Sequence, residues 1–410
     1  MVEVKVLAGS KSIGGNFVRI EDSDRTIIFD QGIRFDIMNK FYSSFITPKS
    51  ITELRNLGVA PKPEWYEGIN GIYISHMHLD HLGFLSNIPI ETKVYLPSKK
   101  IYSEMEKRWG SSPTWLSLVP GKYFLKIEEL KLLEEDENNV MAIPVSHSAY
   151  PSYALLYFGK DETVLYTGDF RVESFLTEDE YLDLYKGQSL LDFLSKNKDI
   201  KVDTLIIEGT NFGSDRFPLT PVNAIEAIKR LASSHAPLIA TLHGLDLEYA
   251  FALMKAASEL NLKCYVASEQ IASLLESMPK LPAELETIED YVQNITSFEG
   301  TTLEDVEDKA IYLASYREIV DFIKDLASFG KLTREVAAIL SEPEPQIEEA
   351  SEYDVIANWL SVMGVNTYRV RVSGHYYPYQ LKSIMDVIKP SKVKAIHTIN
   401  PNLIYNILGK

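Results

Sequence analysis

The sequence predicts an α/β fold, and three observations favour it. Short apolar runs that suit β-strands recur over residues 1–207. Helical and strand patterns then alternate over residues 220–364, which is typical of helices packed on a parallel sheet. Strand patterns return after residue 367, so the alternating section is interpreted as an insertion into an earlier domain.

The first part of the chain, residues 1–207, is rich in strand signals. Strands are expected over residues 2–7, 16–20, 26–29, 71–74, 140–145, 153–158, 163–167 and 203–207. The runs 153–158 and 163–167 are expected to form a hairpin. Residues 97–109 carry helical signals, whereas residues 123–133 have a strand-like but ambiguous pattern.

The inserted part, residues 208–367, alternates between the two patterns. Helices are expected over residues 221–234, 247–260, 316–327 and 355–364, after residue 268 and around 284–291, with strands over 238–242, 263–267 and 336–340. The acidic stretch 284–308 is interpreted as an exposed helical face. In the return segment, 368–410, strands over 368–372 and 393–396 flank a helix over 379–388.

Side chains of the types that bind metal ions are most concentrated in residues 75–83. Three of the eight histidines, His76, His78 and His81, fall here together with Asp80. Imidazole nitrogens and carboxylate oxygens are the ligands that zinc prefers. Separate polar residues on a solvated turn are the alternative, but so dense a run would then be a strong coincidence. Because a strand precedes the run, we predict a loop-borne metal site with two centres.

Further residues of the ligand type also follow strand-like runs. They are Asp30, His147, Asp169, Glu208, His375 and His397. Taken alone, Asp30 is better interpreted as a turn cap, and His147 and Asp169 as ordinary polar loop residues. Together with the histidine run, these residues are expected to meet at one metal site, where Asp30 would orient a ligand imidazole. The remaining histidines, His235 and His243, are interpreted as structural.

Composition narrows the class of protein. The 41 basic and 58 acidic residues give a net charge of −17, which argues against nonspecific adhesion to nucleic acid or to an anionic membrane. The single cysteine, Cys264, suits a reducing cytoplasm, which is the expected location. The N-terminus lacks the pattern of a signal peptide, and no apolar stretch approaches the length of a membrane span.

The motifs, in their order along the chain, resemble the metallo-β-lactamase superfamily. The resemblance rests on Asp30, the His76/His78/Asp80/His81 signature, His147 and Asp169 in Thr167-Gly168-Asp169. Glu208, then Ser373-Gly374-His375 and His397, flanking the long insertion, resemble the β-CASP nuclease branch and, within it, ribonuclease J and its archaeal relatives. The resemblance implies an αββα sandwich of residues 1–207 and 368–410, with residues 208–367 as an inserted β-CASP domain.

The resemblance also implies roles for these residues. One zinc ion would be held by His76, His78 and His147, and a second by Asp80, His81 and His397, with Asp169 bridging both. Asp30 would support these ligands from outside. Two such ions hold a bridging hydroxide for in-line attack at phosphorus. His375 would be the general acid that protonates the leaving 3′ oxygen, with Glu208 orienting its imidazole.

The implied substrate is RNA, because a histidine at position 397 resembles the RNA-processing subgroup. Single-stranded RNA is expected in a cleft between the two domains, where cationic and aromatic side chains would contact it. Candidate contacts are Arg171, Arg216, Ser373, Gly374, Tyr376 and Tyr377. The chain departs from the family at Tyr376-Tyr377, where a small residue is usual, and at Leu242-His243-Gly244, which bears on a 5′-phosphate pocket.

Other functions stay open. A lactonase or thioesterase of the same superfamily shares the first metal motif, but it needs neither the insertion nor the pair His375 and His397. A DNA-directed β-CASP nuclease is a further alternative. A catalytically silent RNA-binding subunit would be expected to have lost ligands, and none is lost here. Exonucleolytic or endonucleolytic cleavage, the physiological metal and a homo-oligomeric state are left undecided.

Overall fold

The computed structural model describes residues 2–43, 45–109, 126–213, 219–235, 237–278, 280–316, 318–341 and 350–409. The chain divides into two compact units. The first comprises Met1–Val172, Asp179–Phe217 and Gly374–Lys410, and the second Glu173–Glu178 and Pro218–Ser373. Both combine helices with sheets, which confirms the α/β class. The domain limits expected from the sequence, 208 and 367, stay a prediction.

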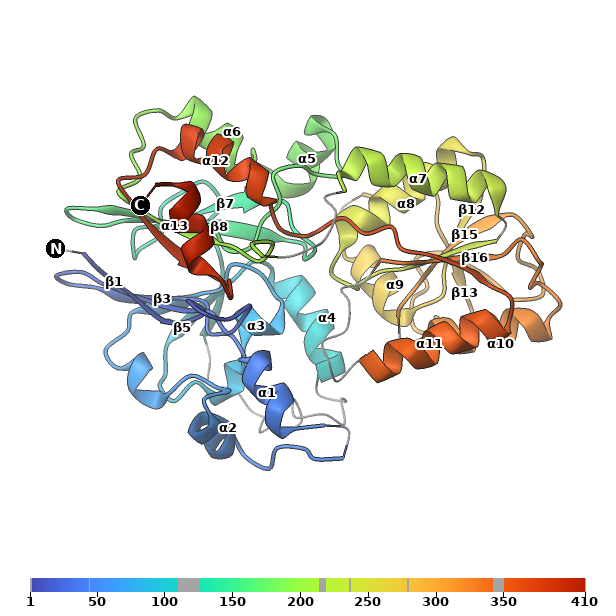
Figure 1. The fold of residues 1–410 in the computed structure, drawn as a ribbon, viewed down its shortest axis with the longest axis horizontal. Coiled ribbons are helices and arrows are strands. Elements are labelled where there is room, and N and C mark those ends of the chain that lie inside the picture. Colours follow the sequence, from blue (N-terminus) through green and yellow to red (C-terminus); the bar gives the residue numbers. More distant parts are fainter. Residues whose placement is uncertain are drawn as a thin grey trace. The chain divides into compact units, whose positions relative to one another are not determined.

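The first unit contains two sheets (Figure 1). One has the spatial order β1 (Glu3–Ala8), β2 (Phe17–Glu21), β3 (Thr26–Phe29), β4 (Gly71–Tyr73), β5 (Lys93–Leu96) and β6 (Lys126–Glu129). The other has the order β18 (Lys392–Ile396), β10 (Thr204–Glu208), β9 (Thr163–Tyr166), β8 (Ser152–Phe158) and β7 (Val140–Val145). Strands β8 and β9 pair antiparallel, which confirms the predicted hairpin.

The two sheets share one apolar core. Phe29 and Tyr73 of the first sheet pack with Leu155, Tyr166 and Ile206 of the second in a single buried cluster. The outer face of the second sheet is covered by α6 (Leu190–Lys196), α12 (Leu381–Ile388) and α13 (Pro401–Ile407). Helices α1 (Phe35–Phe41), α2 (Ile51–Leu57) and α4 (Lys99–Trp109) lie on the side of the first sheet (Figure 1). The layers therefore run helix, sheet, sheet, helix.

Parallel pairing aligns neighbouring strand ends within each sheet of the first unit. Strand β10 pairs parallel with β9 and with β18, with Glu208 opposite Ile396. Strand β3 pairs parallel with β4, with Phe29 opposite Tyr73. Because the carboxyl ends of parallel strands meet at the same edge, the residues that follow these strands are brought together. All five side chains of β10 are buried, as expected of a strand covered on both faces.

The second unit is built on a seven-stranded sheet whose pairings are all parallel. Its order is β14 (Glu299–Thr301), β13 (Glu286–Ile288), β12 (Lys263–Val266), β15 (Ala310–Ala314), β11 (Leu238–Thr241), β16 (Ala337–Leu340) and β17 (Asn366–Tyr368). The helices are α7 (Pro221–Ser234), α8 (Leu247–Glu259), α9 (Glu269–Glu276), α10 (Ile319–Ser328) and α11 (Ala350–Val362).

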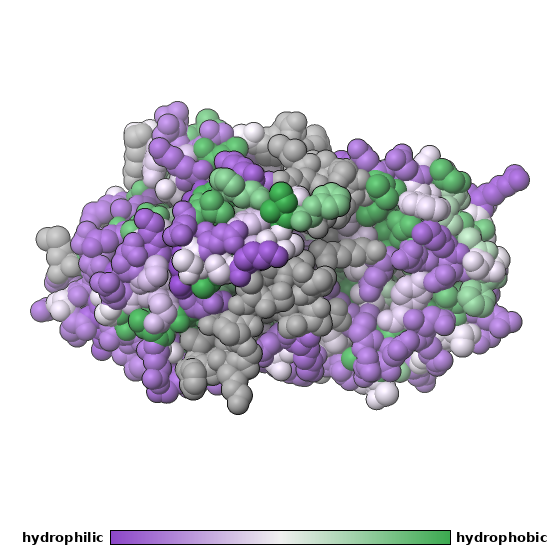
Figure 2. All heavy atoms as spheres, turned by 90° about the horizontal axis from the view of Figure 1, so that it is seen from below, coloured by the Kyte–Doolittle hydropathy of each residue, from purple (hydrophilic) through white to green (hydrophobic). Residues whose placement is uncertain are grey.

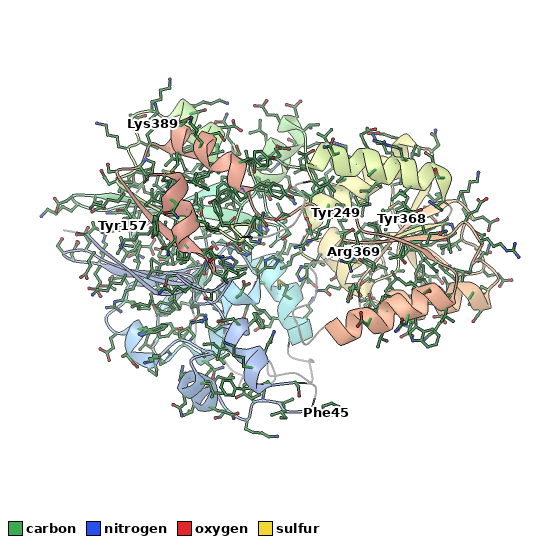
Figure 3. All side chains as sticks on the ribbon, in the orientation of Figure 1. Phe45, Tyr157, Tyr249, Tyr368, Arg369 and Lys389 are labelled. Carbon is green, nitrogen blue, oxygen red and sulfur yellow. The ribbon has the colours of Figure 1, made fainter. Side chains whose placement is uncertain are left out.

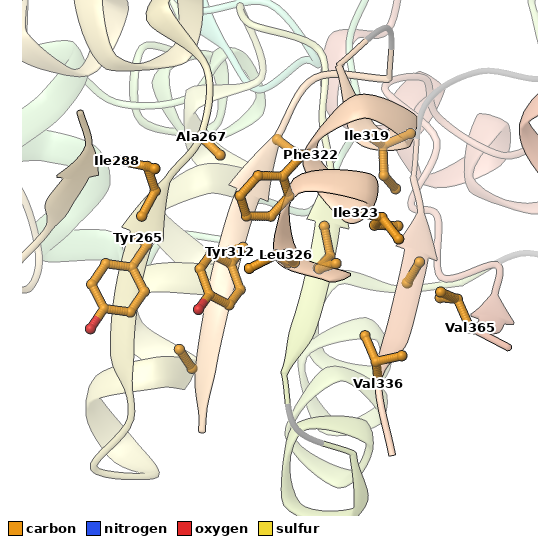
Figure 4. Packing of buried hydrophobic residues seen from close by; sticks show 14 of the residues in the cluster. Tyr265, Ala267, Ile288, Tyr312, Ile319, Phe322, Ile323, Leu326, Val336 and Val365 are labelled. Atoms are coloured by element: carbon orange, nitrogen blue, oxygen red, sulfur yellow. The ribbon is translucent and has the colours of Figure 1, made fainter. Parts of the chain in front are cut away.

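The core of the second unit forms where α10 packs on this sheet (Figure 4). Ile319, Phe322, Ile323 and Leu326 are buried, and their spacing of three and four residues places them on one face of the helix. The ring of Phe322 packs against that of Tyr312 on β15, with 5.2 Å between the ring centroids. The apolar stripe of α10 thus holds the helix on the sheet.

Several expectations are wrong in the second unit and the return segment. The helix expected around residues 284–291 and the helical face expected over 284–308 are both wrong, because these residues contain the short strands β13 and β14. The apolar residues Ile288, Leu303 and Val306 of this stretch are buried in the core. The strand expected over 368–372 ends at Tyr368. In addition, several elements in both units were not anticipated, among them strands β5 and β15 and helices α1, α2, α5 (Glu178–Tyr185), α6 and α13.

The face of the molecule shown in Figure 2 is mainly hydrophilic where it is coloured. On the face shown in Figure 2, hydrophilic side chains cover most of the coloured surface and hydrophobic ones form small groups. Phe45, whose side chain extends away from the ribbon in Figure 3, is 95% exposed. In the part of the chain that the structure describes, no helix is both long enough and apolar enough to span a bilayer.

Candidate metal centre

The histidine run leaves the end of β4 on a tightly held loop. After His76 and His78 the chain forms a single helical turn, α3 (Leu79–Leu82), which carries Asp80 and His81. The turn ends at Gly83 with φ 63°, and a Cβ atom there would lie 1.8 Å from the Gln31 carbonyl oxygen. Only glycine fits so close to a neighbouring backbone, so this turn of the loop is fixed by sequence.

Three imidazoles form the first group of ligand atoms. His78 Nδ1 lies 3.2 Å from His76 Nε2 and 3.3 Å from His147 Nε2. Two nitrogens that share a tetrahedral zinc ion, with Zn–N bonds of about 2.05 Å, are about 3.3 Å apart. His147 follows β7, so residues from both sheets of the first unit meet here. The two measured distances therefore match the spacing of nitrogens that share one such ion, and all three ligand atoms lie within 4.8 Å of one another.

Asp80, His81 and His397 form the second group. Asp80 Oδ2 lies 3.2 Å from His397 Nε2 and 3.8 Å from His81 Nε2. Asp169 lies between the groups, because its Oδ2 is 3.0 Å from His81 Nε2 and 3.4 Å from His397 Nε2, yet also 3.9 Å from His76 Nε2. This placement suits a carboxylate shared by two cations.

Four of the ring nitrogens that do not face the centre have partners outside it. The pairs are His76 Nδ1 with Ser75 Oγ (3.1 Å), His81 Nδ1 with Asp30 Oδ2 (2.7 Å), His147 Nδ1 with the Gly374 carbonyl oxygen (2.7 Å) and His397 Nδ1 with Thr210 Oγ1 (2.8 Å). Such partners fix the ring orientation and the tautomer of a ligand histidine. Each imidazole thereby turns its other nitrogen toward the centre.

Two buried polar atoms of the centre also fit a cation. Among the described residues, His81 Nε2 and Asp169 Oδ1 are buried without a hydrogen-bond partner. His81 Nε2 does lie 3.0 Å from Asp169 Oδ2, but this is a close ionic contact rather than a hydrogen bond. Buried polar atoms are normally paired, and a metal ion is an accepted reason for an exception. These groups of histidine and carboxylate side chains could hold a metal ion, and zinc is one of the ions that such ligands bind.

The charges of the site lead to the same conclusion. Burial, reinforced by neighbouring imidazoles, lowers the pKa of His76 and of His147 well below the usual value, so both rings are neutral and ready to bind metal at neutral pH. Burial also opposes a charge on His81, but Asp169, Asp80 and Asp30 outweigh it and raise its pKa well above the usual value. Three carboxylates therefore favour positive charge at this point, which a divalent cation supplies.

His375 and Glu208 adjoin the two groups. His375 Nδ1 lies 3.2 Å from Glu208 Oε1 and 3.9 Å from Asp169 Oδ2. Glu208 is fully buried, and its other carboxylate oxygen accepts a hydrogen bond of 2.8 Å from Thr210 N. The His375 side chain is 15% exposed, so its ring combines a buried carboxylate on one side with access to solvent on the other.

Some residues that hold the side chains of the centre in place were not identified in the sequence analysis. Tyr166 OH donates a 2.6 Å hydrogen bond to Asp30 Oδ2, and Asn16 Nδ2 donates one of 2.9 Å to Tyr166 OH. Asp30 also accepts hydrogen bonds from Ser75 N and Ser75 Oγ. The only signal in the sequence was the position of Tyr166 at a strand end, just before Thr167-Gly168-Asp169.

Other predicted contacts lie elsewhere than expected. Arg171 is buried and donates hydrogen bonds to Ser146 Oγ (2.9 Å) and to the His147 carbonyl oxygen (3.2 Å). Tyr376 is 1% exposed and donates a 2.7 Å hydrogen bond to the Glu208 carbonyl oxygen. We therefore assign both side chains a bracing role in place of the substrate contact expected from the sequence.

The other residues that were predicted to contact the substrate differ in their positions. Ser373 is buried, and Gly374 takes part through its carbonyl oxygen, which holds His147. Arg216 lies outside the described residues. Tyr377 is half-buried and follows Tyr376 on the segment that carries His375.

An Asp30→Asn variant is expected to bind zinc about 10- to 100-fold more weakly. An amide keeps the shape of the carboxylate but loses its charge, so the hydrogen bond to His81 Nδ1 weakens. Competition with a chromogenic chelator measures the affinity. Asp22→Asn is the control, because Asp22 also accepts from a tyrosine, Tyr157, but outside the centre. Unchanged zinc affinity in Asp30→Asn would contradict the assigned role.

A Gly32→Ala variant is expected to destabilise the fold by about 3 kcal/mol or more. A Cβ atom at position 32 would lie 1.5 Å from the Asp80 carbonyl oxygen, so the loop that carries Asp80 would have to move. Urea unfolding measures the loss. In the control Gly68→Ala the new Cβ meets nothing within 4 Å, and only the left-handed backbone at φ 67° costs about 1 kcal/mol. Equal losses in the two variants would contradict the steric argument.

Comparison with known proteins adds a relation to ribonucleases. No family model matches the chain. Ribonuclease J of Helicobacter pylori is 25% identical over 196 residues, which cover 45% of this chain and 25% of that protein. Ribonuclease J of Synechocystis is 24% identical over 191 residues, 45% of this chain and 27% of that protein. RNase aCSPSF2 of Saccharolobus solfataricus is 32% identical over 95 residues, 22% of this chain and 16% of that protein.

These matches are partial, since the matched segments span about a quarter or less of each relative cited. A solved structure covers far more of the chain. A protein of unknown function from Enterococcus faecalis matches 98% of this chain and 95% of its own with a TM-score of 0.72 at 19% identity. At this identity the likeness shows a shared fold alone. The sequence matches relate the chain to ribonucleases at low identity.

Proposed function

We propose that this protein is a zinc-dependent ribonuclease of the β-CASP branch of the metallo-β-lactamase superfamily. The observation that carries the proposal is the position of Asp169 between two groups of ligand atoms, with the His375–Glu208 pair beside it. The helix–sheet–sheet–helix layers of the first unit support an αββα sandwich, and the second unit would be the inserted domain. The ribonuclease relatives support RNA as the substrate.

Zinc would be held by His76, His78 and His147 at one position and by Asp80, His81 and His397 at the other, with Asp169 shared. Bound zinc supplies Lewis-acid charge to a phosphodiester and lowers the pKa of the attacking water toward neutrality. Asp30, Thr210 and the Gly374 carbonyl orient the ligand imidazoles. They keep the ligand nitrogens directed at the centre without further reorganisation.

His375 is the proposed general acid. Its Nδ1 faces the Glu208 carboxylate, so Nε2 is the nitrogen that would carry the proton delivered to the leaving 3′ oxygen. Glu208 stabilises the protonated ring before transfer, in the way that a buried carboxylate stabilises an imidazolium. The Tyr376 hydroxyl and Asn211 hold this segment, because Asn211 Nδ2 donates hydrogen bonds to the carbonyl oxygens of His375 and Tyr376.

The purified 410-residue chain, loaded with zinc, tests the proposal. RNA labelled at either end, carrying a 5′ monophosphate, triphosphate or hydroxyl, would be incubated beside matched DNA, and metal content would be measured by mass spectrometry. We expect cleavage of RNA that stops on chelation and returns with zinc, with about two ions per chain. Intact RNA together with hydrolysis of a lactone or thioester panel would overturn the nuclease proposal, and preferential cleavage of DNA would overturn the choice of RNA.

A further inference from the structure

We propose that Tyr377 and Tyr379 form a stacking surface for an unpaired base of the nucleic-acid strand that enters the centre. This inference rests on the proposed nuclease function and adds a base-binding subsite to it. The two rings are nearly parallel, with 8° between their planes and 6.0 Å between their centroids. Tyr379 is 62% exposed, which is high for a large aromatic side chain. We name this pair the tyrosine surface.

The segment that carries the tyrosine surface is held firmly on both sides. Tyr376 N donates a 2.7 Å hydrogen bond to the Phe170 carbonyl oxygen, and the Tyr376 ring packs against Phe170 and Phe212. Beyond it, η4 (Pro378–Gln380) is a short 3-10 turn in which Gln380 Oε1 accepts a 2.9 Å hydrogen bond from Tyr377 N. A rigid mount lowers the entropy cost of binding a base to an aromatic face.

The backbone conformation of this segment directs Tyr377 away from the core that holds Tyr376. Tyr377 has extended backbone angles, φ −95° and ψ 151°. Successive side chains of an extended segment point to opposite sides, and Tyr376 points into the core with Phe170 and Phe212. Tyr377 therefore points away from that core. Tyr379 follows His375 by four residues, a backbone distance of at most about 14 Å, so a base close to the scissile phosphate can reach it.

The charge of the chain gives a reason for such a surface. A net charge of −17 opposes the approach of a polyanion, and the candidate cation beside the centre, Arg171, is buried. Base–aromatic stacking supplies affinity without positive charge and tolerates every base. A stacking surface next to His375 would therefore hold an unpaired base near the cut while leaving the phosphate to the metal centre. Paired bases would be excluded, because their faces are already stacked.

Binding measurements test the tyrosine surface apart from catalysis. The variants would be made in the zinc-loaded 410-residue chain carrying His375→Gln, so that RNA is bound without being cut. Fluorescence anisotropy would compare a labelled uridine 12-mer with an abasic ribose-phosphate chain of the same length. We expect the parent to bind the uridine strand about tenfold more tightly than the abasic strand. Tyr379→Ala should weaken uridine binding about tenfold and abolish that preference.

Matched variants separate stacking from other effects. Tyr379→Phe keeps the aromatic face and should bind within about twofold of the parent, whereas Tyr379→Leu keeps apolar bulk alone and should resemble Tyr379→Ala. Phe45→Ala removes an exposed aromatic elsewhere and should change nothing. The ratio between parent and Tyr379→Ala should also hold between about 50 and 200 mM salt, because stacking releases no counterions.

The outcomes of the two sets of experiments are distinct. Equal affinities of the parent and Tyr379→Ala for the uridine strand, or a parent that binds uridine and abasic strands alike, would overturn the tyrosine surface. Absence of any binding by the parent would overturn it as well. Cleavage of RNA by the unmodified chain is read independently, so its failure would reject the nuclease proposal whatever the binding data show.

Discussion

A His81→Ala chain is expected to hydrolyse RNA more than about a thousandfold more slowly than the unmodified chain. His81 Nε2 belongs to the second group of ligand atoms and lies 3.0 Å from Asp169 Oδ2, the shared carboxylate. Losing one cation removes several kcal/mol of transition-state charge stabilisation, and about 4 kcal/mol corresponds to a thousandfold. Initial rates on end-labelled RNA and zinc content per chain measure the effect, with about one ion lost.

His235→Ala is the matched control for this variant. It also removes a histidine that has hydrogen-bond partners, Tyr368 OH and the Glu335 carbonyl oxygen, but it lies in the second unit at the end of α7. We expect it to keep both rate and zinc content. Circular dichroism would establish that the His81→Ala chain remains folded. Two ions and an unchanged rate in folded His81→Ala would refute the assignment of His81 as a ligand.

A His375→Ala chain is expected to lose about a hundred- to ten-thousandfold of its activity on RNA while it keeps its zinc. His375 contacts the Glu208 carboxylate at 3.2 Å but belongs to neither of the two proposed coordination sets. The loss should depend on the leaving group. Hydrolysis of bis(p-nitrophenyl) phosphate, whose leaving group needs no protonation, should fall less than about tenfold. Steady-state rates on both substrates provide the comparison.

Glu208→Gln is the companion to this variant. It keeps the size of the side chain and the contact with Thr210 N but removes the charge beside His375, so a smaller loss, about tenfold to a hundredfold, is expected on RNA. A His375→Ala chain that loses equal activity on both substrates would argue for a role in positioning or in the fold. Full activity on RNA would remove the general-acid role altogether.

The fold class and the convergence of the strand ends could be predicted from the sequence because they depend on local patterns. The apolar runs before Asp30, His147 and His397 indicated strands, and parallel pairing brings the carboxyl ends of β3 and β4 together, and likewise those of β10 and β18. The hairpin of β8 and β9 was also predicted from a local pattern. The structure brings the seven ligand-type side chains into one centre. Their roles as zinc ligands remain predictions.

The features that could not be predicted depend on contacts between residues that are far apart in the sequence. The hydrogen bond from Tyr166 to Asp30 joins residues that are 136 positions apart, and no local pattern indicates it. Strands β13 and β14 have three residues each, too few to show an alternation, and their acidic side chains resemble those of an exposed helix. The burial of Tyr376 depends on Phe170 and Phe212, so an aromatic beside His375 could not be classified as core or contact from its neighbours in the chain.

The order of the ligands along the chain has a consequence for synthesis of the protein. His76, His78 and His147 are all present once the chain has been made as far as residue 147, whereas His397 comes with β18, whose parallel partner β10 ends at Glu208. A nascent chain can therefore assemble the first group of ligands early but lacks the last ligand of the second. If two ions are needed to cut RNA, the chain can become active only after His397 has been made and β18 has paired with β10.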